Sequence, residues 1–300
     1  MKPSATIVFT TYNRQDILQQ AIQAARKQTV SIDIIVMDDA STDGTATMMA
    51  TEFPNIKYHR SSENKGPCYQ RNRGIELAKT EIVFALDDDS ILQSPHTIEQ
   101  TLTEFDEKTA IVAIPFINIL QNNIINTQAP DRKNIYLTHA FVAASHAVNR
   151  QKFLDAAGYR EFFFYMGEEG DVAIRLLQQG YFVRLGTADP IHHLQPPNRI
   201  SAKADIFGRQ NDLVFLFCNA PLKYLITYLL GTLIKGMWYG IKVGRIHNMI
   251  KGFYQGFKLL FSQQKMRFPV EINCFQLYRS LKQQQIISFT QVKSYFQPGI

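Results

Sequence analysis

Short apolar runs alternate with segments of helical spacing through the first 120 residues, and this alternation restricts the fold more than any other feature. β-branched residues fill the apolar runs, while between them apolar residues recur at intervals of three and four. Strands that alternate with helices pair in parallel and are covered by helices on both faces. The predicted strands are 5–10, 32–37, 56–59, 81–86 and 110–117, and the predicted helices are 14–28, 43–53, 66–79 and 95–106.

The length of the chain allows one large domain with an appendage, and the charge is unevenly distributed between them. With 45% hydrophobic and 19% charged residues, the 300-residue chain has the composition of a globular protein. Residues 1–202 carry 19 basic and 23 acidic side chains, whereas residues 203–300 carry 13 basic and 3 acidic ones. We therefore expect an α/β domain with a mostly parallel central sheet over 1–220, followed by a basic, apolar helical extension over 221–300.

Three consecutive carboxylates, Asp87, Asp88 and Asp89, directly follow the predicted strand 81–86. Carboxylates this close repel one another, so the cluster needs water or a cation to neutralise it. A solvated acidic loop is one alternative. Ligands of open parallel sheets bind at the carboxyl ends of the strands, however, and Mg²⁺ and Mn²⁺ prefer carboxylate oxygens. A divalent metal is therefore the better candidate.

Further polar segments follow the other predicted strands and should meet the three carboxylates at the same edge of the sheet. They are residues 10–13 after the first strand, 38–44 after the second, and 64–66 with Arg71 at the start of a helix. Helix capping explains an aspartate at position 43 but not Asp38 and Asp39, which directly end an apolar strand. The sequence therefore predicts a polar site at this edge.

These segments, in this order, resemble the nucleotide-sugar-binding half of a family 2 glycosyltransferase with the GT-A fold. Each segment alone is a weak motif, but together they match in register through the first third of the chain. The resemblance implies that 1–220 is the catalytic domain, with 1–120 binding the nucleotide sugar and 121–220 contributing the acceptor side and the catalytic base. The matching segments are 6–14, 34–45, 64–66 with 71–75, and 84–89.

The resemblance also implies roles for individual residues. Asp89 is the metal ligand of the D-x-D pattern, and a metal there would offset the charge that develops on the departing nucleoside diphosphate. Asp87 and Asp88 would serve the ribose and the metal water. Arg71 would lie near the nucleotide, although a structural salt bridge is an equal alternative. The remaining nucleotide-sugar contacts are Thr10 and Tyr12 near the base, and Asp39 at a uracil-type edge.

A second acidic group, Glu168, Glu169 and Asp171, precedes a predicted helix over 172–179. Acidic residues are common at helix N-termini because they complement the helix dipole, and Asp171 can pair with Arg175 one turn later. The resemblance implies that Glu169 is the base that deprotonates the acceptor, where the family usually has Asp. Asp171 is the second candidate and Glu168 the third. A base opposite the departing diphosphate implies inversion at the anomeric carbon.

The adjacent His192 and His193 follow a predicted strand over 181–185. A histidine is often structural, but the pair resembles the late histidine with which the family completes its metal shell, and His193 is the preferred ligand. Arg199 either contacts the diphosphate or is a solvated loop arginine.

Residues 222–260 combine apolar side chains at helical spacing with scattered lysines and aromatic residues. This composition suits helices at a bilayer interface, and packing onto the catalytic domain or a second subunit is the alternative. Nucleic acid is disfavoured because no recognition module is visible. With no export signal, no spanning segment and three dispersed cysteines, we expect a cytoplasmic protein that is peripheral on the cytoplasmic face of a membrane.

The expected function is metal-dependent, inverting transfer of a sugar from a nucleoside diphosphate donor, most simply a UDP-sugar, to a hydroxyl of a saccharide or lipid-linked saccharide. Mg²⁺ or Mn²⁺ is the expected cofactor, and residues 110–170 should bind the acceptor. A non-catalytic nucleotide-sugar-binding protein is the first alternative. A sugar-nucleotide nucleotidyltransferase is disfavoured because the loop after the first strand lacks glycine. The sugar, the acceptor and the oligomeric state stay open.

Overall fold

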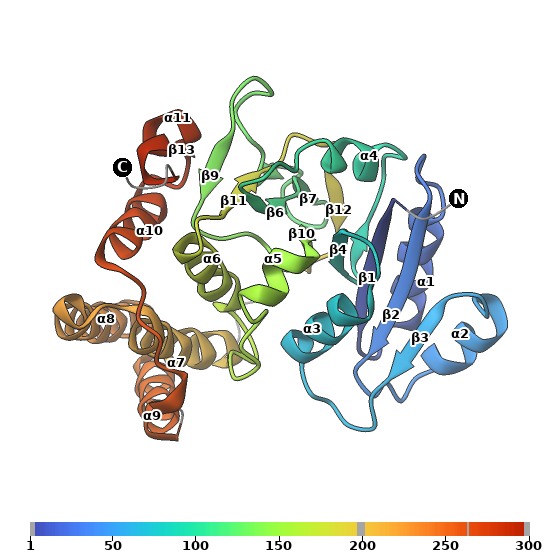
Figure 1. The fold of residues 1–300 in the computed structure, drawn as a ribbon. Helices are drawn as coiled ribbons and strands as arrows, with labels where there is room; N and C mark the ends of the chain where they lie inside the picture. Colours follow the sequence, from blue (N-terminus) through green and yellow to red (C-terminus); the bar gives the residue numbers. More distant parts are fainter. Residues whose placement is uncertain (1–3, 197–201, 263, 297–300) are drawn as a thin grey trace.

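The computed structural model describes residues 4–196, 202–262 and 264–296 (Figure 1). Its centre is a nine-stranded sheet in the order β13-β9-β11-β6-β10-β4-β1-β2-β3. Within the described part of this sheet, only β9 and β10 run against the other strands. The strands are β1 (Ala5–Thr11), β2 (Ile32–Asp38), β3 (Lys57–Arg60), β4 (Ile82–Asp87), β6 (Thr109–Ala113), β9 (Tyr136–Thr138), β10 (Ser145–Asn149), β11 (Phe182–Leu185) and β13 (Ile287–Ser288).

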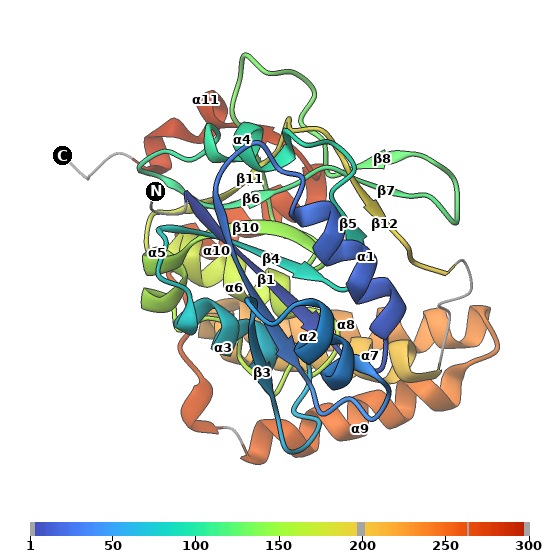
Figure 2. The ribbon, with the colours of Figure 1, turned by 90° about the vertical axis from the view of Figure 1, so that its right-hand side faces the viewer.

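Helices cover both faces of this sheet, which confirms the expected α/β class with a mostly parallel sheet. One core lies between the strands and the helices α1, α2 and α4, and the other lies between the strands and α3, α5, α6 and α10. The two layers stand on opposite sides of the strands in Figure 2. The helices are α1 (Gln15–Ala25), α2 (Thr45–Glu52), α3 (Pro67–Leu77), α4 (Thr97–Leu102), α5 (Arg150–Asp155), α6 (Glu168–Gln178) and α10 (Ile272–Gln284).

The prediction of one strand over 110–117 is wrong, because the chain leaves the large sheet at Pro115. Proline has no N–H to donate to a strand ladder, so strands seldom continue through it. After β6, residues Phe116–Asn118 form β7 in a separate four-stranded sheet. The order there is β5-β12-β7-β8, with β5 (Ser90–Ile91), β12 (Ile191–His193) and β8 (Ile125–Asn126). This small sheet joins the segment after Asp89 to the histidine pair.

The predicted helix over 172–179 begins four residues earlier, at Glu168. Its first turn contains Glu168, Glu169 and Asp171, so the acidic group is part of the helix instead of preceding it. The other early strands and helices lie at the predicted places, with ends that differ by a few residues.

The expected C-terminal extension divides into two parts. In the first part, α8 (Leu222–Lys242) and α9 (Ile246–Ser262) pack on each other and on α7 (Ala202–Asn219), a helix that lies within the expected 1–220 domain. The three helices stand beside the sheet in Figure 1. After η1 (Gln264–Met266) the chain returns to the sheet domain, where α10 packs against α6 and β13 pairs with β9. The short α11 (Phe289–Val292) and η2 (Lys293–Phe296) complete this return. Among the described helices, none is long and apolar enough to cross a membrane.

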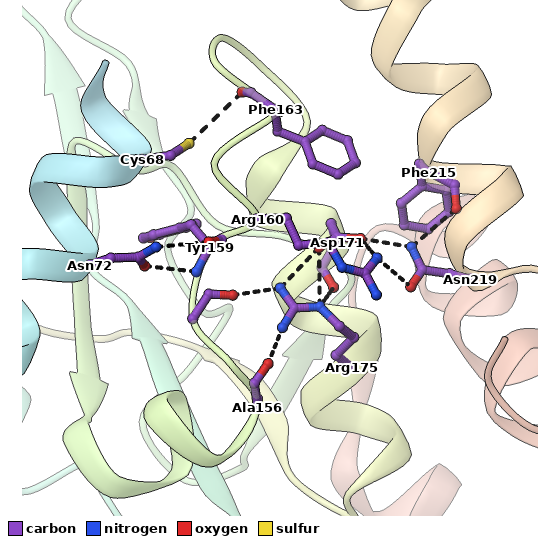
Figure 3. A network of polar contacts seen from close by, with 11 residues as sticks. Cys68, Asn72, Ala156, Tyr159, Arg160, Phe163, Asp171, Arg175, Phe215 and Asn219 are labelled. Atoms are coloured by element: carbon purple, nitrogen blue, oxygen red, sulfur yellow. Dashed lines mark hydrogen bonds and ion pairs between the residues drawn. The ribbon is translucent and has the colours of Figure 1, made fainter. Parts of the chain in front are cut away.

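A buried ion network fixes α6 against its neighbours (Figure 3). Asp171 is fully buried, and its Oδ1 accepts hydrogen bonds from Arg160 Nη1 and from Asn219 Nδ2 on α7, both at 2.8 Å. Its Oδ2 accepts from Arg175 Nη2 at 2.9 Å. Arg175 also donates to the main chain at Ala156 and Gly158. Asp171 therefore neutralises two guanidinium groups and ties the start of α6 to the loop before it and to α7.

The variant Asp171→Asn should destabilise the protein strongly, because it leaves two buried guanidinium groups without their carboxylate. The expected loss in unfolding free energy is about 3–5 kcal/mol, as for other buried pairs that lose one partner. Urea unfolding followed by circular dichroism measures it. Asp155→Asn, at an exposed position of α5, is the matched control and should change stability by less than about 0.5 kcal/mol. Equal midpoints for the two variants would contradict a structural role of Asp171.

Candidate active site

A cavity of about 570 Å³ opens at the carboxyl ends of β1, β2 and β4. The elements that border it are far apart along the chain: the loops after these strands, the starts of α3, α6 and α7, and the end of β12. Nine of the ten predicted site residues line it: Thr10, Tyr12, Asp39, Arg71, Asp87, Asp88, Asp89, Glu169 and His193. The tenth, Asp171, does not line it and is occupied by the ion network described above.

The three consecutive aspartates have different partners, and this separates their roles. Asp87 Oδ1 accepts from Thr10 Oγ1 at 3.1 Å and from Arg71 Nη2 at 2.6 Å. Asp88 accepts from Thr11 Oγ1 at 2.8 Å. Arg14 Nη1 bridges the other two carboxylates, at 3.0 Å from Asp88 Oδ1 and 2.7 Å from Asp89 Oδ2.

The surroundings shift the pKa values of Asp88 and Asp89 in opposite directions. Burial raises the pKa of Asp88 to about 7, against the opposing charge of Arg14, and the neighbouring Asp89 charge adds to the rise. Burial also acts against ionisation of Asp89, but hydrogen bonding and charge from His193 and Arg14 outweigh it and lower the pKa to about 2. Asp89 is therefore the carboxylate of this pair that stays ionised.

Asp89 and His193 together fit a divalent metal. Asp89 Oδ1 is buried, and its polar contact among the residues that the structure describes is with His193 Nε2, at 3.3 Å. The other ring nitrogen, His193 Nδ1, lies 2.8 Å from Asn118 Oδ1, an oxygen that only accepts, so Nδ1 carries a hydrogen and Nε2 is the ring nitrogen that faces Asp89 and could bind a metal. Adjacent ligands of an octahedral ion at about 2.1 Å are separated by about 3 Å, close to the spacing seen here.

Two protein ligands leave most of the coordination shell to other molecules. Within the described ranges, no group of three or more His, Cys, Asp or Glu side chains is placed to hold a metal. Mg²⁺ is often bound by one or two carboxylates together with water and substrate phosphates. The donor set at Asp89 and His193 thus suits an ion that arrives with, or is completed by, a phosphorylated ligand.

Asp39 and Asp38 hold the loops that shape the cavity. Asp39 Oδ1 accepts from the Lys65 amide at 2.8 Å and from Gln70 Nε2 at 2.7 Å, and its Oδ2 accepts from the Gly66 amide at 2.9 Å. Gly66 has a φ of +89°, and a Cβ there would lie 2.6 Å from the Phe164 ring, so glycine is required. Asp38 is fully buried and accepts from the Ser41 amide and the Tyr58 hydroxyl, which explains the carboxylate that helix capping left unexplained.

Arg71 joins the two acidic groups of the cavity. Its guanidinium lies 2.6 Å from Asp87 at the end of β4 and 3.6 Å from Glu168 Oε1 at the start of α6. The side chain is only 4% exposed, and the opposing charge of Asp87 keeps it ionised despite its burial. Two roles were left open for Arg71, a contact with the nucleotide and a structural salt bridge. The salt bridge is present, and Arg71 also lines the cavity.

Glu168 and Glu169 are adjacent acids, and the pKa of each is raised. Burial raises the pKa of Glu168 to about 8; the charge of Glu169 adds to this rise and Arg71 opposes it. Burial also raises the pKa of Glu169, against hydrogen bonds from main-chain amides and the charge of Arg71. Two such neighbours titrate as a pair, and the pKa of about 8 at Glu168 keeps one proton on the pair at neutral pH.

Three residues that the sequence did not single out complete the geometry. Arg14 lies inside the matching segment 6–14, so its proximity to the aspartates was available from the motif. Lys203, at the start of α7, also lines the cavity. The sequence carries no signal for Asn118, because this residue meets His193 only through the parallel pairing of β7 with β12. Arg199, a predicted diphosphate contact, lies outside the described residues.

The model of the glycosyl transferase family 2 matches residues 6–162, which is more than half of the chain, and the chain belongs to this family. Among curated relatives, the O-antigen chain rhamnosyltransferase WbaN of Salmonella anatum is 26% identical over 210 residues, covering 64% of this chain and 66% of WbaN. The GalNAc(5)-diNAcBac-PP-undecaprenol beta-1,3-glucosyltransferase of Campylobacter jejuni is 35% identical over 97 residues. That alignment covers 31% of each protein, so the chain spans about a third of this relative's length.

Solved structures share the GT-A fold with this chain. The mannosyltransferase PcManGT from Pyrobaculum calidifontis, in complex with GDP-Man and Mn²⁺, superposes with a TM-score of 0.57 at 16% identity, covering 99% of this chain and 85% of that one. A fragment of S. aureus TarS in complex with UDP-GlcNAc superposes with a TM-score of 0.61 at 14% identity, covering 83% and 79%. At these identities the likeness shows the fold alone.

Loss of either a metal ligand or its hydrogen-bond partner should weaken metal binding. In the presence of UDP, Asp89→Asn should abolish Mn²⁺ binding, measured by electron paramagnetic resonance of the free ion. Asn118→Ala should weaken the affinity by about 10–100-fold, because the His193 ring loses the partner that orients it. Asn122→Ala, exposed in the turn after β7, is the control. Unchanged Mn²⁺ affinity in both Asp89→Asn and Asn118→Ala would exclude this pair as the metal site.

Proposed function

We propose that this protein is an inverting glycosyltransferase that moves a sugar from a UDP-linked donor to a hydroxyl of a saccharide or lipid-linked saccharide. The observation that carries the proposal is the composition of one cavity. It combines a two-ligand metal site, Asp89 with His193, and an acidic pair with raised pKa values, Glu168 with Glu169. Such a cavity combines electrophilic help for a departing diphosphate with a base for an incoming hydroxyl.

The donor end of the cavity supports a uracil nucleotide. Thr10, Tyr12 and Asp39 stand at the ends of β1 and β2. Asp39 Oδ2 accepts from the Gly66 amide alone and so retains a lone pair that can accept from the N–H of a uracil edge. The TarS structure was solved with UDP-GlcNAc. Because PcManGT was solved with GDP-Man, the likeness of fold does not favour uracil over guanine as the nucleobase of the donor. The preference for UDP rests on Asp39.

The chemistry follows from the placement of the charged groups. Mg²⁺ or Mn²⁺, when bound at Asp89 and His193, would offset the negative charge of the diphosphate. Asp87 and Asp88 are held by Arg71 and Arg14 in positions that suit the ribose and the metal water. Glu169 takes the proton of the acceptor hydroxyl while the hydroxyl oxygen bonds to the anomeric carbon. The bond from that carbon to the diphosphate breaks on the opposite face. Direct displacement inverts the anomeric configuration.

The choice of Glu169 as base rests on accessibility. Asp171 binds two arginines and does not line the cavity. Glu168 is 5% exposed and faces Arg71, whereas Glu169 is partly exposed. Retention of both the metal ligands and the acids argues against a non-catalytic binding protein. We assign catalysis to 1–220, with the donor half in 1–120 and the acceptor half in 121–220, while β13 shows that part of 221–300 supports the same sheet.

A membrane surface is the second proposed partner. Apolar residues of α8 recur at intervals of three or four along one exposed face of the helix, each at least 55% exposed. Residues 213–270 contain no Asp or Glu, whereas α8 and α9 with their connection contain six Lys or Arg. Exposed apolar stripes beside positive charge fit an anionic bilayer interface. The stripe consists of Leu222, Ile226, Leu230, Ile234, Trp238 and Ile241, and α9 adds Ile250, Tyr254, Phe257 and Phe261.

Donor turnover with Mn²⁺ tests the proposed reaction. UDP release from UDP-Glc, UDP-Gal or UDP-GlcNAc, with water as the acceptor, should fall by about 10²–10⁴ in Glu169→Gln, because the base is lost. Glu161→Gln, an exposed acid just before the site, is the matched control and should keep wild-type turnover. If Glu169→Gln kept wild-type turnover, Glu169 would not be the base. Absence of both turnover and nucleotide binding in the wild type would contradict the proposed function.

The pH dependence of the same turnover should report the acidic pair. A base works only when deprotonated, and burial raises the pKa of Glu169, so kcat/KM should fall with decreasing pH already above the usual glutamate range. Because Glu168, with a pKa of about 8, already holds its proton in the acid limb, its replacement by neutral glutamine in Glu168→Gln should leave that limb in place. A displacement of the acid limb by more than about one pH unit in Glu168→Gln would contradict this assignment of the proton.

Vesicle flotation tests the membrane partner. Wild-type protein should float with phosphatidylglycerol-containing vesicles and should be released by salt, because lysines contribute to the binding. The double variant Ile226→Asp with Ile234→Asp should not float with the vesicles and should remain in the bottom fraction. Both side chains are about 70% exposed, so the fold should tolerate the change. Gln283→Asp with Gln284→Asp, exposed on α10, makes the same charge change and should float like wild type. Equal flotation of all three proteins would reject the α8 surface.

A further inference from the structure

Arg14 lies between two of the three aspartates that follow β4. Its Nη1 is 3.0 Å from Asp88 Oδ1 and 2.7 Å from Asp89 Oδ2. The other oxygen of Asp89, Oδ1, faces His193 Nε2 at 3.3 Å. A metal ion held by Asp89 and His193 would therefore share one carboxylate with the guanidinium of Arg14. The two positive charges would repel each other at short range.

The two arginines at this edge of the sheet differ in how firmly they are held. The side chain of Arg71 is 4% exposed and lies between Asp87 and Glu168. The side chain of Arg14 is 37% exposed and lines the cavity. Ion pairs with an exposed partner contribute little net free energy, because water competes for both charges. A ligand in the cavity can therefore draw Arg14 away from Asp89 more easily than it can displace Arg71.

The main chain on both sides of Arg14 is fixed, so a movement is confined to its side chain. Asn13 has a φ of +54°, and its amide donates to Ser41 Oγ at 2.9 Å. The amide of Gln15 donates to Asp43 Oδ2 at 3.1 Å. Arg14 itself is the N-cap residue of α1, where the helix dipole opposes a positive charge. The helix gives no reason for an arginine here, whereas the acidic edge of the sheet does.

The guanidinium of Arg14 has donors for a second partner. Both contacts with the aspartates are made by Nη1, so the N–H groups on its other two nitrogens take no part in them. The planar array of N–H groups in a guanidinium matches the oxygens of a phosphate. A nucleoside diphosphate in the cavity would offer negative charge both to this guanidinium and to a metal ion. It is thus the ligand that removes the conflict between the two cations.

We propose that Arg14 makes metal binding at Asp89 dependent on the diphosphate of the donor. Without a diphosphate, the guanidinium holds Asp88 and Asp89 together and repels a divalent cation. When the diphosphate binds, the guanidinium pairs with it and gives up Asp89 Oδ2, and the metal is then held by Asp89, His193 and the diphosphate. This positioning role of Arg14 rests on the proposed function, which supplies the metal and the diphosphate.

Mn²⁺ binding in the absence of nucleotide tests this role, with electron paramagnetic resonance of the free ion as the readout. Arg14→Gln should bind Mn²⁺ about tenfold or more tightly than wild type, because the competing positive charge is gone. A purely structural support of Asp89 would give the opposite result, since its loss would weaken Mn²⁺ binding. Arg14→Lys keeps the charge and should stay within about threefold of wild type. Arg73→Gln, at an exposed position of α3, removes the same charge outside the cavity and is the matched control.

Two further variants keep this result decisive. Arg14→Met keeps much of the apolar stem and should show the same gain as Arg14→Gln, and circular dichroism verifies that both proteins are folded. The double variant Arg14→Gln with Asp89→Asn should lose the gain, because the carboxylate that Arg14 guards is gone. A gain that persists in the double variant would place the ion elsewhere and overturn the proposal.

UDP binding measures the same coupling from the other side. Coupling between two ligands is reciprocal, so Mn²⁺ raises the affinity for UDP by the same factor as UDP raises the affinity for Mn²⁺. Equilibrium dialysis of UDP, with EDTA or with saturating Mn²⁺, should give a factor about tenfold or more smaller in Arg14→Gln than in wild type and Arg73→Gln.

The outcomes separate the role of Arg14 from the proposed reaction. An Mn²⁺ affinity of Arg14→Gln that does not exceed that of wild type, or an unchanged coupling factor, would overturn the role of Arg14 and leave the proposed reaction intact. Neither measurement needs turnover. The expected gain in Mn²⁺ affinity would therefore support the role of Arg14 even if no sugar were transferred, a result that would count against the proposed reaction alone.

Discussion

The site depends on the compensation of closely spaced negative charges. Two acidic groups, one after β4 and one at the start of α6, face a single cavity, and Arg71 lies between them with contacts to Asp87 and Glu168. Carboxylates in such a place would repel one another and unfold the loops without a buried cation. Arg14 likewise offsets the charges of Asp88 and Asp89. Arg14 contacts only one carboxylate oxygen of Asp89, and the other oxygen faces His193, where it is available to a metal.

The same principle separates structural from chemical acids in α6. Three acids occupy the first turn of this helix, where the dipole favours all of them. Asp171 satisfies both of its oxygens with arginines, and it anchors the helix to α7 (Figure 3). Glu168 and Glu169 are left with fewer partners and raised pKa values. The helix thus carries its anchor, Asp171, and the pair proposed to include the base within four residues, and the anchor fixes the position of the turn that bears the pair.

The family, the fold class and most of the site were predictable because their signals are local. Alternation of apolar runs with helical spacing predicts parallel strands, and parallel strands place their carboxyl ends at one edge. This edge brings together the predicted residues that follow β1, β2 and β4, and Arg71, Glu169 and His193 reach the same cavity from other elements. The strand predicted over 110–117 was wrong because Pro115 breaks it. Asn118 could not be predicted, since it meets His193 only through pairing of strands that are more than 70 residues apart.

The sequence by itself determined the α/β class, the acidic edge of the sheet and the basic, apolar character of the last third, because periodicity and composition are properties of neighbouring residues. The tertiary structure decided which acid is anchored and which is free, and where the C-terminal segment rejoins the sheet. Those features arise from contacts between α6, α7 and α10, whose residues lie up to about a hundred positions apart. Such contacts leave no periodic trace in the chain, so only the folded arrangement reveals them.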